Sequence, residues 1–394
     1  MLKKSDVPLF LDPLHGVELL INNTPHQHDQ KLPFHINVTI NYDTDTYPTT
    51  LPIWTMLDEG TRYSSLVELY QDNNKHTLSI KCEGQGSFTF DPTKMCIDWQ
   101  SAGTGFEHYL QSLGLAAWLE LQGIPCIHAN AITLDNDAAL IIAPSRTGKS
   151  TLTTHLTNHQ FKLMTDDMAA IHPATDGTFT IYPSWPKVRL WPDMADSLIG
   201  IEVEFEGERE SESESDISVN RKISEVTGIN TDISPNINID LYADTDNDKK
   251  LSNNPNGEKQ PSKPLIAAPQ KKQVHQKFAK YEIKFNTSNN IWHHQPAPLR
   301  AIYYLERLEE NANVECAIER LNASNALIIL LQNSMLADGY VNMGIEVERL
   351  TSLAKILGSI PLYKISYRSG LDNLDNVANQ LKVHFKRTPK QHLK

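Results

Sequence analysis

The sequence predicts a mixed α/β (α+β) fold in which a β-rich N-terminal domain precedes a second domain that a long insertion divides in two. Three observations predict this organisation. Short alternating apolar runs fill residues 1–104, a strand–loop–helix–strand order follows near residue 140, and a polar, acidic stretch occupies residues 202–295. We therefore expect the second domain to comprise residues 105–201 and 296–394.

The composition is that of a globular protein. With 394 residues and 40% hydrophobic content, the chain is long enough for two or three domains with a sizeable core. The net charge of −12 argues against a general nucleic-acid-binding protein, which would usually be basic. No apolar run reaches the roughly 18 residues of a membrane span, and the N-terminus lacks the apolar stretch of a secretory signal. We expect a cytoplasmic protein with no membrane or nucleic-acid partner, and the four cysteines, which lack CxxC spacing, to be free thiols.

The first 200 residues contain the elements of both domains. Runs such as HINVTINYD and GSFTFDPT alternate apolar and polar residues, which predicts a mixed, mostly antiparallel β region. Helical spacing of leucines across 105–122 predicts a helix capped by Gly123. PCIHANAITL and AALIIA read as adjacent strands joined by a tight turn, and a helix (STLTTHLTNH) and a strand region (FKLMTDDMAAIH) follow.

Residues 202–295 break this pattern. EVEFEGERESESESD is mostly acidic residues and serine, and the segment that follows is rich in Asn, Asp, Lys and Pro. Such a composition buries too little apolar surface to offset its ordering entropy, so we expect a long, mainly disordered insertion. A solvated insert without a specific role is the simplest interpretation, and a regulatory or partner-binding role stays open.

The chain after residue 296 returns to apolar patterning. PAPLRAIYYLERL and PLYKISYRS predict strands, whereas NALIILLQNSML, VERLTSLAKILGSI and NLDNVANQLKVHF have helical spacing. The basic tail, KRTPKQHLK, is expected to fray.

The stretch that carries chemistry follows the strand AALIIA. It matches the phosphate-binding pattern G-x-x-x-x-G-K-[ST], except that alanine replaces the first glycine. Backbone N–H groups of such a loop and the positive end of the next helix point at phosphate oxygens; the lysine neutralises the β- and γ-phosphates, and the serine hydroxyl ligates Mg²⁺. We expect ATP and Mg²⁺ as cofactors, held by Ala143, Pro144, Ser145, Arg146, Thr147, Gly148, Lys149, Ser150 and Thr151.

The alternative is an ordinary strand-to-helix turn that happens to contain Gly-Lys-Ser. The apolar strand that ends at Ala143 and the helix that begins after Lys149 favour nucleotide binding. Alanine at the first position is acceptable if it keeps a negative φ.

Two further features accompany this loop. LMTDDMAAI places Asp166 and Asp167 in or at the end of a strand, where one carboxylate can hold Mg²⁺ and another can accept a proton. Neighbouring strand residues face opposite ways, so both reach one site only if the strand has ended. His128 lies on the preceding strand and would sit near the loop if the two strands pair, although a lone strand histidine is more often a core residue.

Together these features resemble the HPr kinase/phosphorylase family, and more closely its divergent HprK-related serine kinases. His128, Lys149 and the Asp166–Asp167 pair keep the family's order and spacing, and LQGIPCIHANAI, APSRTGKSTL, KVRLWPDMADSLIG and PAPLRAIYYLE are similar to stretches of the related kinases. The resemblance covers about 105–200 and 296–385, and it implies an HPr-kinase-like P-loop domain.

The resemblance also implies roles. Residues 143–150 would bind the triphosphate, and Ser150 with Asp166 would hold Mg²⁺. Asp167 would be the general base, and His128 would assist at the transferring phosphate, so that His128, Lys149, Asp166 and Asp167 form the catalytic set. Asp193 is a candidate for a further metal-binding acid, and Arg189 and Arg300 are candidates for an arginine that stabilises the transition state; the Arg189 stem could equally cover apolar surface.

The function expected on this basis is an ATP-dependent serine kinase that phosphorylates a protein or peptide hydroxyl. The Pro-Gly-Arg-Asn signature of true HPr kinases is absent, which argues against HPr itself as the substrate and against phosphorylase activity. Related kinases accompany peptide-modification pathways, including lasso-peptide pathways, so a peptide serine or a small hydroxyl metabolite fits. A small-molecule kinase on the same fold and a non-catalytic nucleotide-dependent binding protein are the alternatives, and a homo-oligomer is left open.

Overall fold

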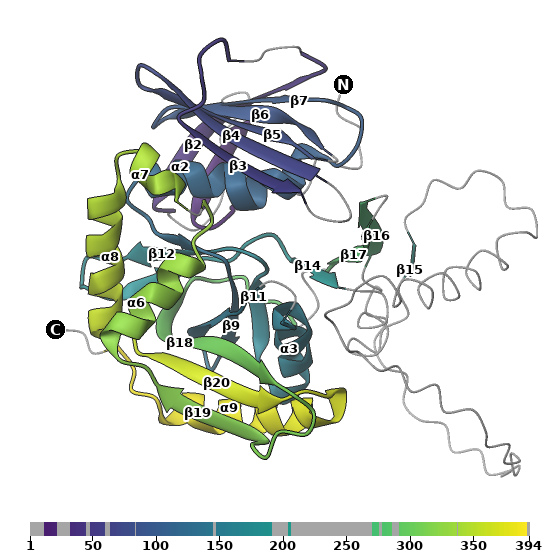
Figure 1. Cartoon of the computed structure of the whole chain (residues 1–394), viewed down its shortest axis with the longest axis vertical. Helices are drawn as coiled ribbons and strands as arrows, with labels where there is room; N and C mark the ends of the chain where they lie inside the picture. Colours follow the sequence, from purple (N-terminus) through teal and green to yellow (C-terminus); the bar gives the residue numbers. More distant parts are fainter. Residues whose placement is uncertain are drawn as a thin grey trace, which may run out of the picture. The chain divides into compact units, whose positions relative to one another are not determined.

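The computed structural model describes residues 12–21, 32–44, 48–59, 64–82, 84–144, 147–190, 204–205, 270–275, 278–285, 291–336 and 338–391. It is a mixed α/β structure with large β-sheets and fewer helices, as expected (Figure 1). Residues 1–204 and 268–394 belong to one unit, and a second unit, 205–267, lies almost wholly outside the described residues. Among the described residues no helix is long and apolar enough to cross a bilayer. The four cysteines are free, as expected.

A seven-stranded sheet occupies the N-terminal region, in the order β1-β2-β7-β6-β5-β4-β3. Its strands are β1 (Val17–Ile21), β2 (Phe34–Tyr42), β3 (Trp54–Glu59), β4 (Ser64–Asp72), β5 (Lys75–Lys81), β6 (Gln85–Phe90) and β7 (Lys94–Trp99). The β1–β2 and β2–β7 pairs are parallel and the other four pairs are antiparallel. The prediction of a mixed, mostly antiparallel β region is therefore confirmed.

The helix predicted at 105–122 packs on this sheet. It consists of α1 (Phe106–Tyr109), a π-helical turn η2 (Leu110–Gly114) and α2 (Leu115–Leu121). Gly114 allows the close approach, because a Cβ there would lie 3.2 Å from the Phe88 ring. Gly123 follows with φ +77°, as expected of a C-cap. The helix and the sheet share one hydrophobic core, which crosses the boundary expected at residue 104.

A second sheet has nine strands. Seven of them follow the order β11-β9-β10-β18-β13-β12-β8, and the other two are β20, which pairs with β18, and β19, which pairs with β20. Its strands are β8 (Cys126–Ile127), β9 (Ala129–Leu134), β10 (Asp137–Ile142), β11 (Lys162–Thr165), β12 (Ala169–Pro173), β13 (Phe179–Ile181), β18 (Ala297–Leu308), β19 (Cys316–Arg320) and β20 (Leu362–Arg368). The tight turn predicted between β9 and β10 has positive φ at Asp135 and Asn136, which suits the right-handed twist of a hairpin.

Helices cover both faces of this sheet. Alternate residues of β10 point to opposite faces: Ala139 and Ile141 belong to one core, and Leu140 and Ile142 to the other. The first core includes α3 (Lys149–His155) and α9 (Leu374–Arg387), and the second includes α6 (Ala323–Gln332) and α8 (Glu346–Ser359), which lie side by side in Figure 1. Burial on both faces explains why β10 is almost continuously apolar. The remaining short helices are η3 (Leu156–His159), α7 (Gly339–Asn342) and η5 (Leu371–Asn373).

A third sheet corrects the expected extent of the insertion. It has the order β14-β17-β16-β15, with β14 (Lys187–Leu190), β15 (Glu204–Phe205), β16 (Gln270–His275) and β17 (Phe278–Lys284). The prediction of disorder up to residue 295 was wrong for β16 and β17. Ile283 and Phe285 are buried and alternate with half-buried Glu282 and Lys284, which is the period of a strand. The rest of the expected insertion, including 206–269, lies outside the described residues.

A buried ion pair ties three of these elements together. The Arg349 guanidinium on α8 donates from Nε to both carboxylate oxygens of Glu120 on α2, at 3.1 Å each, and lies 4.0 Å from the Tyr340 ring centroid. Glu120 also accepts the backbone N–H of Cys126, at 2.8 Å, where β8 begins. A paired, hydrogen-bonded carboxylate is the form in which a buried charge is tolerated, so this contact fixes β8 and the residues that follow it.

Two buried histidines predict how stability responds to acid. Burial lowers the pKa of His15 to about 3, helped by His172, and burial lowers the pKa of His172 to about 4. The unfolded chain therefore binds more protons than the folded one below an ordinary histidine pKa of about 6.5, so stability falls as pH falls through the window down to about 3. The slope is at most about 1.4 kcal/mol per pH unit for each histidine.

The double variant His15→Asn/His172→Gln tests this prediction, because Asn tolerates the positive φ of residue 15 and Gln keeps an N–H donor for the His15 carbonyl. Urea unfolding between about pH 7 and about pH 4 should show a shallower loss of stability than in the parent chain. An unchanged slope in the double variant would contradict the assignment.

Candidate active site

The strand directions bring three segments of the chain to one edge of the second sheet. β10 is antiparallel to β9, and β9 is antiparallel to β11, so β10 and β11 run the same way and end where β9 begins. Residues 143–150, here called the GKS loop, follow β10; Asp166 and Asp167 follow β11; and His128 precedes β9. The carboxyl ends of neighbouring strands are a common place for ligands to bind in α/β folds.

The GKS loop has the strand–loop–helix order that the sequence predicts. Gly148 has φ +90° and precedes α3, a conformation that favours glycine. Thr147 donates from both its backbone N–H and its hydroxyl to the carbonyl of Pro144, at 3.3 and 2.7 Å, which closes a tight turn. The Tyr367 hydroxyl donates to the Thr147 carbonyl at 3.3 Å and supports the loop from β20, which β18 separates from β10. Ser145 and Arg146 lie outside the described residues.

Alanine at the first position of the motif is compatible with this loop. Ala143 is 1% exposed, belongs to the core that includes α3, and is not among the described residues with positive φ. The position therefore needs no glycine. Thr151, in the first turn of α3, is half-buried.

The carboxylate of Asp166 faces the start of α3. Its Oδ1 accepts the Ser150 hydroxyl at 3.1 Å, and its Oδ2 accepts the backbone N–H of Arg189, on β14, at 2.8 Å. An acidic side chain and a serine hydroxyl thus lie in contact at the N-terminal end of a helix. Both offer oxygen ligands, the type that Mg²⁺ prefers, so Ser150 and Asp166 fit the metal-binding pair expected from the sequence.

Asn130 connects the acidic pair to α3. Its fully buried amide donates from Nδ2 to Asp166 Oδ1 at 2.7 Å and to the Thr153 hydroxyl at 3.0 Å. Its Oδ1 accepts the backbone N–H of Asp167 at 3.1 Å. The orientation of the amide follows from these partners, because a carboxylate can only accept and a backbone N–H can only donate.

A tight turn lets both aspartates face the site. β11 ends at Thr165, and the Met168 N–H donates to the Asp166 carbonyl at 2.9 Å, with Asp167 at the centre of this three-residue turn. Asp167 has φ +96°, which is unfavourable for a residue other than glycine. Backbone strain of this kind clusters at functional sites. Strand β11 has therefore ended before Asp166, which is the condition under which both aspartates can face one site.

Asp167 lies among cationic groups. Its Oδ1 is 3.3 Å from His128 Nε2, its Oδ2 is 3.2 Å from an Arg189 guanidinium nitrogen, and its side chain is 35% exposed. Burial works to raise the pKa of Asp167, but the charges of Arg189, His128 and Lys149 outweigh it and hold that pKa well below its usual range. The carboxylate is therefore ionised at neutral pH.

Lysine and arginine supply positive charge on two sides of this carboxylate. The Lys149 side chain, in the first turn of α3, is buried and acts on Asp167 electrostatically. Arg189 also contacts His108 Nε2 at 3.2 Å, which holds the guanidinium toward the site. The structure thus places His128, Lys149, Ser150, Asp166 and Asp167 close together.

The structure bears differently on the candidates for a further metal-binding acid, Asp193, and for a transition-state arginine, Arg189 and Arg300. Arg189 lies in the site, whereas Asp193 lies outside the described residues. The proposal of Arg300 was wrong: its Nη1 pairs with Asp137 at 3.2 Å, at the start of β10, and its Nε donates to the Thr388 carbonyl. The start of β10 is the opposite end of that strand from the GKS loop, so Arg300 cannot reach it.

Sequence reasoning missed three residues of the site: Asn130, His108 and Tyr367. Asn130 had a detectable signal, because it is a polar residue in a strand, ANAITL, whose six residues are all buried. A buried amide in an apolar strand needs partners nearby. His108 and Tyr367 carry no such signal, since their contacts depend on segments far away in the chain.

The Asn130→Leu variant tests the importance of the amide. It keeps the branched shape of the side chain but leaves polar groups of Asp166, Thr153 and Asp167 short of a partner, so we expect the free energy of unfolding to fall by about 1–3 kcal/mol. The matched control is Asn325→Leu on the exposed surface of α6, which should change stability by less than about 0.5 kcal/mol. Urea unfolding of both variants measures this, and equal effects would contradict the role of Asn130.

Comparisons with known proteins add little to this geometry. No protein-family model matches the sequence, and no curated protein matches it. Among solved structures, the Hpr(Ser) kinase/phosphatase from Coxiella burnetii is similar, with a TM-score of 0.27 and 9% sequence identity, over 66% of this chain and 95% of that chain. Similarity at this level establishes neither a shared fold nor a shared activity.

Proposed function

We propose that this chain is an ATP-dependent phosphotransferase that moves the γ-phosphoryl group of ATP to a hydroxyl of a protein or peptide. The observation that carries the proposal is the contact between Ser150, in the first turn of α3, and Asp166, while the adjacent Asp167 faces Lys149 and Arg189. An ordinary strand-to-helix turn gives no reason for two carboxylates and two cations to converge on it.

The triphosphate binds at the GKS loop. Backbone N–H groups at the start of α3, together with the positive end of the helix dipole, attract the phosphate oxygens. Lys149, already buried beside Asp167, places its ammonium group near the β- and γ-phosphates. Ser150 and Asp166 supply oxygen ligands for Mg²⁺, which when bound neutralises the charge of the phosphates.

Asp167 orients the acceptor. The acceptor oxygen attacks the γ-phosphorus, an O–P bond forms, and the bond between the γ-phosphorus and the bridging oxygen breaks, with its electron pair leaving on ADP. The hydroxyl proton passes to the Asp167 carboxylate. Because its pKa is depressed, Asp167 is a weak base that first accepts a hydrogen bond and takes the proton late, which suits the loose transition state of phosphoryl transfer.

Arg189 and His128 act on the same carboxylate from two sides. Each contacts a different oxygen of Asp167, so together they fix its orientation. His128 is 38% exposed and Asp167 is 35% exposed, so an acceptor can reach this side of the site. Arg189 is close enough to stabilise charge that develops on the transferring group.

The variant Lys149→Ala tests the role of the loop. It removes the ammonium group that faces the phosphates, so transfer from γ-labelled ATP should fall by about 10²-fold or more. The acceptors are a serine- and threonine-containing peptide library and a set of small hydroxyl metabolites, with products read by mass spectrometry. The control is Lys355→Ala on the exposed face of α8, which should retain parental activity. Full activity in Lys149→Ala would rule out this role.

The variant Asp167→Asn separates transfer from binding. The amide keeps the size of the side chain but cannot take the proton, so transfer should fall by at least about 10²-fold. Binding of ATP with Mg²⁺, measured by calorimetry, should change by less than about threefold, because Asp166 and Ser150 remain. If the parent chain binds ATP but transfers phosphate to no acceptor, a nucleotide-dependent binding protein replaces this proposal.

A further inference from the structure

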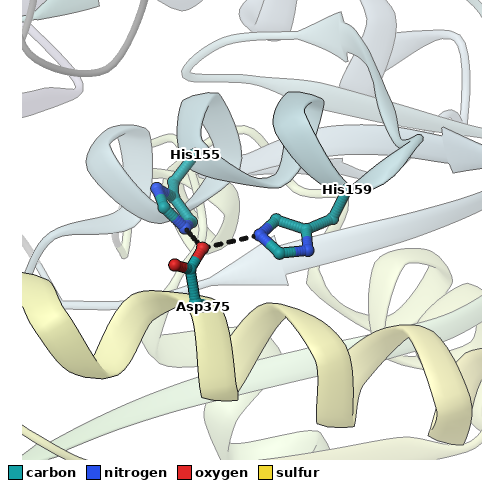
Figure 2. Close-up of side chains that lie close together, drawn as sticks. All are labelled: His155, His159 and Asp375. Atoms are coloured by element: carbon teal, nitrogen blue, oxygen red, sulfur yellow. Dashed lines mark hydrogen bonds and ion pairs between the residues drawn. The ribbon is translucent and has the colours of Figure 1, made fainter.

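A second cluster of side chains lies at the opposite end of α3 from the GKS loop. His155 is the last residue of α3, His159 is the last residue of η3, and Asp375 is near the start of α9 (Figure 2). His155 Nε2 lies 2.9 Å from Asp375 Oδ1, and His159 Nε2 lies 2.8 Å from the same oxygen. The function proposed above uses none of these three residues.

The spacing of the two histidines explains why they converge. Residues four apart on a helical segment lie on one face, and the continuous turn from α3 into η3 keeps His155 and His159 together, with ring centroids 5.3 Å apart. Two imidazoles at this spacing are a frequent pair of zinc ligands. The third group comes from a different helix, so the three residues are not a chance cluster within one turn.

The burial of each group suits a ligand site. The histidine side chains are only 13% and 15% exposed, whereas Asp375 is 72% exposed. His155 Nδ1 is buried, so Nε2 is the nitrogen that an ion can reach, and it points toward the carboxylate. The largely buried imidazoles therefore present their nitrogens, and the exposed carboxylate closes the site from the solvent side.

The three ligand atoms of His155, His159 and Asp375 can hold a small cation after a small rearrangement of their side chains. The three ligand atoms lie within 4.8 Å of one another. Tetrahedral zinc with ligands at about 2.0–2.1 Å separates neighbouring ligand atoms by roughly 3.3 Å. The two N···O distances must therefore lengthen by about half an ångström, and the two Nε2 atoms, which lie within 4.8 Å of each other, must also take up a separation of about 3.3 Å. Rotation of the exposed Asp375 side chain and small rotations of the two imidazoles provide these changes.

The ligand set selects the metal. Two imidazole nitrogens and one carboxylate suit Zn²⁺, whereas Mg²⁺ strongly prefers oxygen ligands. Three protein ligands leave the fourth tetrahedral position for water. His155 Nδ1 has no hydrogen-bond partner among the described residues, and the lack of such a partner typically weakens metal binding by roughly ten- to a hundredfold. The site should consequently be weaker than a closed structural zinc site.

We propose that His155, His159 and Asp375 bind Zn²⁺ and that the ion joins the end of the helix behind the GKS loop to the C-terminal helix. On binding, Nε2 of each histidine must carry no proton, so in the neutral ring the single proton moves by way of solvent from Nε2 to Nδ1 and the ring stays neutral. The site is distinct from the Mg²⁺ pair Ser150 and Asp166, which lies at the other end of α3.

Calorimetric titration with Zn²⁺ alone tests the proposal, using the untagged full-length chain stripped of metal, without nucleotide. We expect one saturable site that excess Mg²⁺ does not displace. Asp375→Asn should weaken it by about 10- to 100-fold, and His155→Gln and His159→Gln by at least as much. The matched control, Asp372→Asn, removes an exposed carboxylate from η5 just before α9 and should bind as the parent does.

Two further readouts keep the test independent of folding and of kinase activity. Zn²⁺ should raise the melting temperature of the parent chain and of Asp372→Asn but not of Asp375→Asn, since a ligand stabilises only the state that binds it. Co²⁺ in place of Zn²⁺ should give the visible absorption of a tetrahedral site. Absence of saturable Zn²⁺ binding, or affinity within about threefold of the parent in all three site variants, would overturn the zinc site and leave the proposed phosphotransferase untouched.

Discussion

The buried amide of Asn130 is the interaction on which the candidate site depends. It contacts the first aspartate of the pair, the backbone of the second, and the hydroxyl of Thr153 on α3. A group with two donors and one acceptor used in this way fixes the distance between the acidic turn and the helix that follows the GKS loop. The alignment of Ser150 with Asp166 follows from this single side chain.

Strand direction and the strained backbone at Asp167 place the other groups of the site around that contact. Strands β10 and β11 are both antiparallel to β9, so the GKS loop and the turn at Asp166 and Asp167 lie at the same edge of the sheet. The positive φ of Asp167 then turns a second carboxylate toward the first, and Arg189, Lys149 and His128 hold that carboxylate ionised. Two negative and two permanently positive side chains balance, which is the charge distribution that the proposed binding of a polyanion with its metal requires.

Much of this arrangement could be predicted from local patterns. The continuous apolar run of β10, the turn at Asp135, the cap at Gly123 and the separate strand and helix patterns after residue 296 are properties of short windows, and the structure contains them. Features set by long-range pairing could not be predicted in the same way. Arg300 resembles a site residue in sequence but lies at the wrong end of its strand, and β17 was hidden by the polar residues that surround it. His108 and Tyr367 reach the site from elements that no sequence window connects to it.

The pairing of β10 with β18 has a consequence for how the chain is made. Ala139 lies opposite Ala301, and the helices α6 and α8 on one face and α9 on the other come still later in the chain. The apolar strand that leads into the GKS loop pairs with β9, which precedes it, but leaves the ribosome long before β18, its second partner, exists. Contacts of such wide sequence separation slow folding and leave hydrophobic edges open to wrong partners in the meantime. A nascent chain stalled before β18 should accordingly depend on chaperones, and the core of the N-terminal sheet is also incomplete at that point, because it includes Leu336, Tyr340 and Met343.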